Sequence, residues 1–258
     1  MNYRKLGKTG LLVSEVGFGG EWLERHDVEH SVNLIRHAHK QGINIIDCWM
    51  PDPKSRDIIG QGIADCRDQW FVQGHIGLST HNPLMAKRAV ETGFVEMILF
   101  SINPAFDMHP ATENLEDLLS GNFDPALSGI DPQRSALYRL CEERDVGITV
   151  MKGFFGGALF DEKRSPVGAV FTPAQLSHYA LTRPAVASLR CGSDPVEQID
   201  RAVAYETASP DERDYASVIA AAPLHSYKGQ CTYCGHCKPC PMEIDIAMVN
   251  KLYDLAIQ

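Results

Sequence analysis

The chain has 258 residues, of which 44% are hydrophobic and 22% charged, and its formal net charge is −9. This length supports one large domain with a full core, or one domain with a small appendix, and the composition is typical of a soluble globular protein. The acidic balance argues against a nucleic-acid partner, and the lack of any apolar run of roughly 20 residues argues against a membrane span.

Hydrophobic patterning predicts strands that alternate with helices along most of the chain. The expected strands are 13–20, 43–47, 70–76, 95–102, 146–151 and 185–189. The expected helices are 30–40, 55–64, 83–92, 132–144, 173–181 and 195–206, and 105–130 is expected to be irregular. Near-continuous apolar strands between helices indicate an α/β fold with a parallel sheet. Six or seven strands are fewer than the eight of a closed (β/α)8 TIM barrel.

A cysteine run near the C-terminus carries the strongest chemical signal. Four of the eight cysteines lie within ten residues, at Cys231, Cys234, Cys237 and Cys240. Thiolates are soft ligands, two-residue gaps let a loop surround a cubane, and the following Pro241 is typical of bacterial ferredoxin runs. The run predicts a [4Fe–4S] cluster. Structural zinc is the alternative, although zinc sites usually pair two separated Cys knuckles.

The last gap of this run is two residues, whereas the usual ferredoxin run has three. Either all four cysteines bind one cluster, or three do and an outside ligand completes the site, for which Cys48 and Cys191 are candidates.

The N-terminal residues 1–7 contain no hydrophobic signal core, so we expect a reducing cytoplasmic location. The pattern also changes near Ala208-Ser209-Pro210, which predicts a barrel-like domain over 1–208 and a helical iron–sulfur tail over 209–258.

Several short segments also carry a family resemblance. They are 3–10 and 13–20 for an N-terminal hairpin and first strand, 42–47 for a second strand, 77–82 and 150–153 for later strand ends, and 231–246 for the tail. In these segments the chain resembles the aldo/keto reductases, in particular the subgroup with a C-terminal ferredoxin-like tail. The resemblance implies a (β/α)8-type barrel and an oxidoreductase that acts on a small molecule.

The resemblance also implies candidate catalytic residues. In that family an Asp and a Lys tune a Tyr that protonates the carbonyl, NADPH gives hydride, and a His orients the substrate. Asp47 matches the Asp and His75 lies near the Lys position, whereas the segment after Asp47 contains no Tyr. His81 and Lys152 also lie at expected strand ends, where barrel active sites are found, and complete the candidate catalytic set.

The junction after His75 indicates a missing piece of the barrel. His75-Ile76-Gly77 resembles the end of the family's third strand, and Leu78-Ser79-Thr80-His81 resembles the end of a later one. The family has a helix, a strand and a helix between these points. We therefore expect that the chain lacks one or more βα units, and that the barrel is incomplete with open strand edges.

The family's cofactor-binding positions correspond to Ser79 and Asn82 after one strand and to Arg190 and Ser193 after the last, whereas Asp194 would repel a 2′-phosphate.

The leading interpretation is an iron–sulfur oxidoreductase that passes electrons between the cluster and a site on the barrel rim. It would use a small-molecule substrate, a redox partner protein and, by resemblance, NAD(P)H. The alternatives are a non-catalytic electron carrier or binding module on a degenerate barrel, and a structural zinc protein.

Overall fold

A curled parallel sheet forms the centre of the protein. The computed structural model describes residues 1–21, 23–48, 53–73, 77–108, 130–192, 195–222 and 249. The sheet has the strand order β5-β4-β3-β9-β8-β7-β6, and all neighbours run parallel. The strands are β3 (Val16–Phe18), β4 (Ile45–Asp47), β5 (Phe71–Gln73), β6 (Leu78–Thr80), β7 (Met97–Ser101), β8 (Gly147–Met151) and β9 (Val186–Cys191).

An N-terminal hairpin closes the end of the sheet at which the strands begin. It pairs β1 (Tyr3–Lys5) with β2 (Leu12–Ser14) around the 3-10 turn Gly7–Thr9. Leu6 and Val13 of the hairpin pack with Ile45 of β4 in one buried cluster. The expected strand 13–20 is therefore two strands. The chain breaks between them at Glu15, a 6% exposed carboxylate that accepts a 2.5 Å hydrogen bond from Arg4 Nε.

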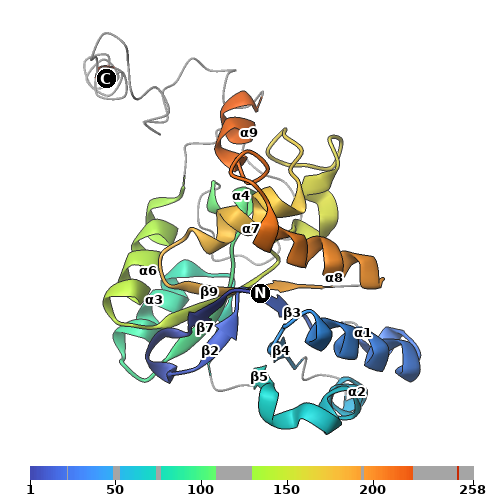
Figure 1. Cartoon of the computed structure of the whole chain (residues 1–258). Coiled ribbons are helices and arrows are strands. Elements are labelled where there is room, and N and C mark those ends of the chain that lie inside the picture. Colours follow the sequence, from blue (N-terminus) through green and yellow to red (C-terminus); the bar gives the residue numbers. More distant parts are fainter. Residues whose placement is uncertain are drawn as a thin grey trace.

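Helices cover the outer face of the sheet and confirm the predicted alternation (Figure 1). They are α1 (Val28–Lys40), α2 (Pro53–Ile63), α3 (Pro83–Glu91), α6 (Pro132–Glu143), α7 (Pro173–Leu181) and α8 (Val196–Val203). Short 3-10 segments follow at Leu23–Arg25, Ala64–Gln69, Phe155–Phe160 and Ala204–Thr207. Two further short helices, α4 (Pro104–Asp107) and α9 (Tyr215–Ala221), pack near α7 in a second cluster that includes Ala105, Leu176 and Ile219. The helices begin where the sequence offers caps, such as the capping box of Thr172 and Gln175 on α7.

The curl of the sheet follows from contacts of Gln73 on the edge strand β5. Gln73 Oε1 accepts hydrogen bonds from Thr149 Oγ1 of β8, at 3.1 Å, and from Arg190 Nη2 of β9. β9 and β8 are the third and fourth strands away from β5. In a flat sheet with strands about 4.8 Å apart, these residues would be separated by roughly 14 to 19 Å. The sheet therefore bends into an open barrel, and these side chains point into its concave interior, here called the lumen.

The barrel is open between β5 and β6, as the junction in the sequence predicted. Only four positions, 74–77, separate Gln73 from Leu78. Adjacent parallel strands need a crossover of a dozen or more residues, so these two strands do not pair and instead form the two edges of the sheet. Every residue of β9 is buried, whereas β5 and β6 contain no buried residue.

A buried carboxylate ties the helices together at the end of β7. Asp107, the last residue of α4, is fully buried and accepts hydrogen bonds from Tyr138 of α6, at 2.6 Å, and Tyr179 of α7, at 2.9 Å. Arg134 Nε lies 3.2 Å from Asp107 Oδ1 in an ion pair that lacks hydrogen-bond geometry. Arg134 also donates to Ser101 O at 2.7 Å and lies 4.6 Å from the centre of the Phe100 ring. The cluster fixes α4 against α6 and α7.

We expect that Asp107→Asn lowers the free energy of unfolding by about 3 kcal/mol, because it leaves the guanidinium of Arg134 buried without a counter-ion. Tyr138→Phe should cost only about 1 kcal/mol, because it removes one hydrogen bond. Urea unfolding followed by circular dichroism measures both values. Equal losses in the two variants would contradict an ionic role for Asp107.

Candidate functional site

The ends of several strands bring polar side chains to one rim of the open barrel. In a parallel sheet all carboxyl ends lie at the same edge, which is where barrel active sites are found. Asp47 ends β4, His81 follows β6 and Lys152 follows β8. The structure therefore places three of the four predicted catalytic residues at this rim. The fourth, His75, lies outside the described residues.

An ion pair crosses the rim from one strand end to another. Lys152 Nζ donates to Glu21 Oε2 at 3.0 Å, and the two side chains are 39% and 28% exposed. Glu21 follows β3, which is separated from β8 by β9. The sequence analysis missed Glu21. Its position directly after Gly19 and Gly20, at the end of the first barrel strand, was the signal that could have identified it.

His81 lies close enough to Lys152 and Glu21 for their charges to change its pKa. Burial lowers the pKa of His81, the positive charges of Lys152 and Arg134 lower it further, and Glu21 raises it. Its Nδ1 is buried and has no hydrogen-bond partner among the described residues, and its ring lies 5.9 Å from that of Phe106. At neutral pH the imidazole is therefore uncharged, with one nitrogen able to donate a proton and the other able to accept one.

Asp47 is held by the turn that follows β3. Its Oδ1 accepts a 2.9 Å hydrogen bond from the Gly20 amide. This approach requires glycine, because a Cβ on Gly20 would lie 2.0 Å from the Asp47 carbonyl oxygen. Burial raises the pKa of Asp47, and the charge of Arg190 and the Gly20 hydrogen bond partly offset that rise. Asp47 is thus a half-buried carboxylate whose ionised form is favoured by a cation inside the barrel.

That cation, Arg190, lies in the lumen. It is 6% exposed, its Nη2 donates to Gln73, and a Cβ on Gly17 would lie 2.6 Å from its Nη1. Burial lowers the pKa of Arg190 to about 10. Its Nε and Nη1 have no hydrogen-bond partners among the described residues. A role in phosphate binding, as the family resemblance implied, would require the guanidinium to leave Gln73 and turn out of the lumen.

The other predicted cofactor-binding residues are spread over the same end of the barrel. Ser79 is exposed on β6. Asn82 is the N-cap of α3, and its Oδ1 accepts from the amides of Leu84 at 2.8 Å and Met85 at 3.2 Å. Ser193 lies outside the described residues. The amide oxygen of Asn82 is therefore already used by the helix.

The predicted metal ligands Cys231, Cys234, Cys237 and Cys240 also lie outside the described residues. Within the described part of the chain, no group of three or more His, Cys, Asp or Glu is placed to hold a metal ion.

The two candidate outside ligands differ in their surroundings. Cys191 is 3% exposed, and burial raises its pKa to about 12. This buried environment favours the protonated thiol over the thiolate that binds metal. Cys48 is half-buried beside Asp47, and burial raises its pKa as well. The surroundings of Cys191 therefore do not suit completion of a cluster.

Two buried tyrosines lie near the rim but do not replace the missing family Tyr. Tyr138 and Tyr179 are each 2% exposed, and both hydroxyls donate to Asp107. Burial and the charge of Asp107 raise the pKa of each well above 10. These hydroxyls are buried away from the rim surface and are already used as donors to Asp107. Among the described rim residues, the neutral imidazole of His81 is the better candidate for proton transfer.

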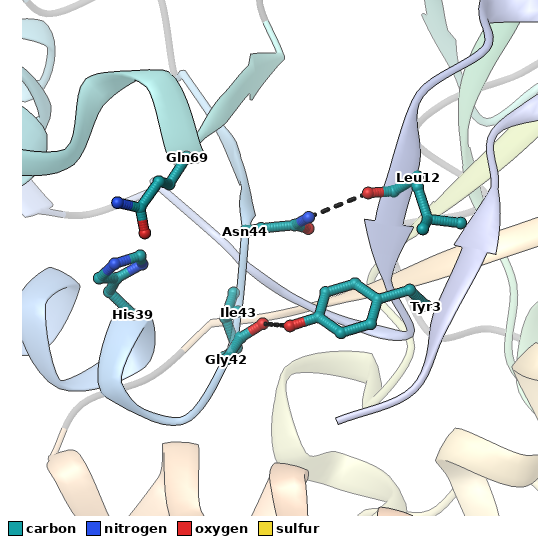
Figure 2. A pocket seen from close by; sticks show the side chains of 7 residues that line it. All are labelled: Tyr3, Leu12, His39, Gly42, Ile43, Asn44 and Gln69. Carbon is teal, nitrogen blue, oxygen red and sulfur yellow. Dashed lines mark hydrogen bonds between the residues drawn. The ribbon is translucent and has the colours of Figure 1, made fainter.

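A shallow pocket of about 460 Å³ lies at the opposite end of the barrel (Figure 2). It is lined by the hairpin and the start of β4, through Tyr3, Leu12, His39, Gly42, Ile43, Asn44 and Gln69. Tyr3 donates to Gly42 O at 2.9 Å, and Asn44 donates to Leu12 O at 2.9 Å. These bonds attach the hairpin to the barrel, and the rim residues do not line this pocket.

Comparison with known proteins identifies the fold. No protein-family model matches the sequence, and no curated protein matches it. An aldo-keto reductase from Bacillus halodurans in its holo form has a TM-score of 0.51 at 15% identity, over 86% of this chain and 97% of that chain. An aldo/keto reductase from Klebsiella pneumoniae, solved with NADP and acetate, has a TM-score of 0.45 at 14% identity, over 82% and 92%.

At these identities the likeness concerns architecture alone, and the argument rests on the Bacillus structure. The described part of the chain contains no helix with the length and apolar character of a membrane span. The chain has an aldo/keto-reductase-like α/β fold whose barrel is open on one side.

We expect that Arg190→Met destabilises the protein more as the pH rises from 4 to 7. The pKa of the Asp47 carboxyl is already above its usual 3.8 in the folded protein, and loss of the cation would raise it further. Well below pH 3.8 the carboxyl is protonated whether or not the chain is folded, so its contribution vanishes there. Above that pH, ionising it in the folded variant costs more than in the wild type. Urea unfolding at several pH values measures this trend.

The matched control for this experiment is the same substitution in an Asp47→Asn background. There the loss caused by Arg190→Met should not vary between pH 4 and 7. An equal pH dependence in both backgrounds would show that Arg190 acts on a group other than Asp47.

Proposed function

We propose that this protein is an iron–sulfur oxidoreductase that reduces or oxidises a small organic molecule at the barrel rim. The observation that carries the proposal is the meeting of Lys152, Glu21 and His81 at the carboxyl end of an aldo/keto-reductase-like sheet. The ends of three different strands bring the ammonium of Lys152, the carboxylate of Glu21 and the neutral imidazole of His81 to the same rim. This combination can bind a polar substrate and move a proton.

The rim residues have distinct roles in this proposal. His81 is the proton-transfer group, because its lowered pKa keeps it neutral with both a donor and an acceptor nitrogen. Lys152 binds the oxygen at which negative charge develops, since its ammonium is a point charge held at the mouth. Glu21 orients that ammonium. The half-buried Asp47 and the buried Arg190 lie beneath them.

The cysteine run would supply the redox centre. Cys231, Cys234, Cys237 and Cys240 have the spacing to hold a [4Fe–4S] cluster, which when bound transfers single electrons. Eight positions, 223–230, separate Cys231 from Ala222, the residue that follows α9, and an extended chain over this interval spans roughly 30 Å. Because α9 packs with α4 in the second cluster, at the end of β7, a tail domain over 209–258 is within reach of the rim.

NAD(P)H is a second candidate donor, supported by the fold. The described residues provide few contacts for a nicotinamide cofactor, because Asn82 caps a helix and Arg190 lies in the lumen with Gln73. We therefore assign no step to a nicotinamide. A redox partner protein would serve as the electron source instead.

We expect that the full-length protein purified without oxygen contains about four iron and four acid-labile sulfide per chain and has a broad brown absorbance. Cys234→Ser should lose most of the iron, whereas Cys66→Ser, which changes a half-buried free thiol outside the run, should keep it. Elemental analysis and a visible spectrum measure both.

One zinc per chain with no sulfide would contradict the cluster. That result would favour a structural zinc site on the tail, and the rim would then be tested for other chemistry.

We expect that His81→Gln and Lys152→Met each lower turnover of small carbonyl compounds with a reduced viologen donor by roughly 10- to 100-fold, because each removes a proton-transfer or charge-stabilising group. Iron content should stay unchanged. The matched control is Lys87→Met, which removes an exposed Lys whose ion pair within the described residues is with Glu91 on the surface of α3, at 3.8 Å. A full cluster without turnover of any compound in the wild type would contradict the enzyme and favour a non-catalytic electron carrier.

A further inference from the structure

Lys152 has an unusual backbone conformation for its residue type. Its φ is +56°, in the left-handed region that favours glycine. A non-glycine residue there costs about 1 kcal/mol or more, and such residues persist only where their surroundings hold them. The next residue, Gly153, is pressed against β9, because a Cβ on it would lie 2.3 Å from Leu189 Cδ1. The turn after β8 therefore leaves little freedom to the residue that carries the rim ammonium.

The carbonyl group of Lys152 is fixed from the neighbouring strand. Asn103, which follows β7, donates from Nδ2 to Lys152 O at 2.7 Å, and the Phe155 amide donates to the same oxygen at 2.9 Å. Asn103 is 1% exposed. Its Oδ1 meanwhile accepts from the Phe106 amide at 2.9 Å as the N-cap of α4. One buried amide thus joins the start of α4 to the left-handed turn.

Asn103 is itself held in place by the buried cluster around Asp107. Asn103 is the N-cap of α4 and Asp107 is its last residue, and Asp107 fixes this one-turn helix to α6 and α7 through Tyr138 and Tyr179. The Asp107 amide donates to Asn103 O at 2.9 Å, so the backbone of Asn103 is joined directly to this cluster. The hydrogen bond to Lys152 therefore starts from a rigid support.

We propose that Asn103 is a positioning residue: through its hydrogen bond to the carbonyl group it keeps Lys152 in the left-handed conformation and so directs the ammonium towards Glu21 and His81. Asn103 touches neither the reacting atoms nor Glu21 and acts through Lys152. The effect of Asn103 on turnover rests on the proposed function. The hydrogen bond through which Asn103 positions Lys152 does not depend on that function.

The test uses His81 as a reporter of the position of Lys152. The charged groups that face His81 are Lys152, Arg134 and Glu21, and Lys152 lowers its pKa. The variant is Asn103→Ser, because serine retains a neutral cap for α4 but is too short to reach the Lys152 carbonyl. The His81 titration is followed by ¹H–¹⁵N NMR of the imidazole in the oxidised full-length protein, with Lys152→Met as the reference.

We expect Lys152→Met to raise the titration midpoint of His81, and Asn103→Ser to raise it in the same direction by no more than that amount. In the double variant Asn103→Ser should add nothing. The matched control is Asp27→Ser, which changes the N-cap of α1, a side chain that accepts from the His30 amide at 2.8 Å. It should leave the midpoint unchanged.

Two outcomes separate the possible failures. If Lys152→Met shifts the midpoint and Asn103→Ser does not, the positioning role of Asn103 is overturned while the rim site stands. If Lys152→Met has no effect, His81 and Lys152 do not lie together, and the site under the proposed function is overturned with it. Should Asn103→Ser fold poorly in thermal unfolding, Asn103→Thr, which also supplies a short neutral cap, replaces it under the same criteria.

Discussion

The four-residue connection between β5 and β6 is the constraint on which the rest of the structure depends. Two adjacent parallel strands cannot be joined by so short a segment. The strands on either side of it therefore become the two edges of the sheet, and the barrel stays open there. An open parallel sheet leaves its edge strands weakly held. The hydrogen bonds of Gln73 to Thr149 and Arg190 across the lumen supply some of the support that a neighbouring strand would give β5.

The curl of the sheet, which these contacts across the lumen reveal, also brings the strand ends together into a rim. β3, β6 and β8 are not neighbours in the sheet, yet Glu21, His81 and Lys152 interact because the sheet bends their ends towards a common mouth. Beneath them the lumen is polar, because it holds the buried Arg190, whose charge favours the ionised form of the half-buried Asp47. Behind the rim, the Asp107 cluster makes α4 rigid. The open side thus leaves the rim formed by these strand ends in place.

The sequence predicted the alternation of strands and helices well, because apolar runs such as 95–102 and caps such as Thr172 are local signals. It also predicted the break at Leu78 and the places of Asp47, His81 and Lys152 at strand ends. It did not predict Glu21 or the direction of Arg190, because both depend on which strands the curl brings together. Nor did it predict Asp107 as the centre of a cluster, since its partners lie on two distant helices. The roles of His75, Ser193 and the four tail cysteines stay predictions, because these residues lie outside the described part of the chain.

The central claim is that the rim and an iron–sulfur cluster work together on one small substrate. Anaerobic stopped-flow mixing tests it directly, with full-length protein reduced beforehand and then mixed with small carbonyl compounds while the visible absorbance is followed. Each carbonyl takes two electrons and two protons, so two reduced chains should be reoxidised per molecule converted to the alcohol. The account predicts that at least one compound restores the oxidised spectrum in this ratio. A cluster that stays reduced with every carbonyl compound, while NAD(P)H added separately is consumed by the same compounds, would contradict it.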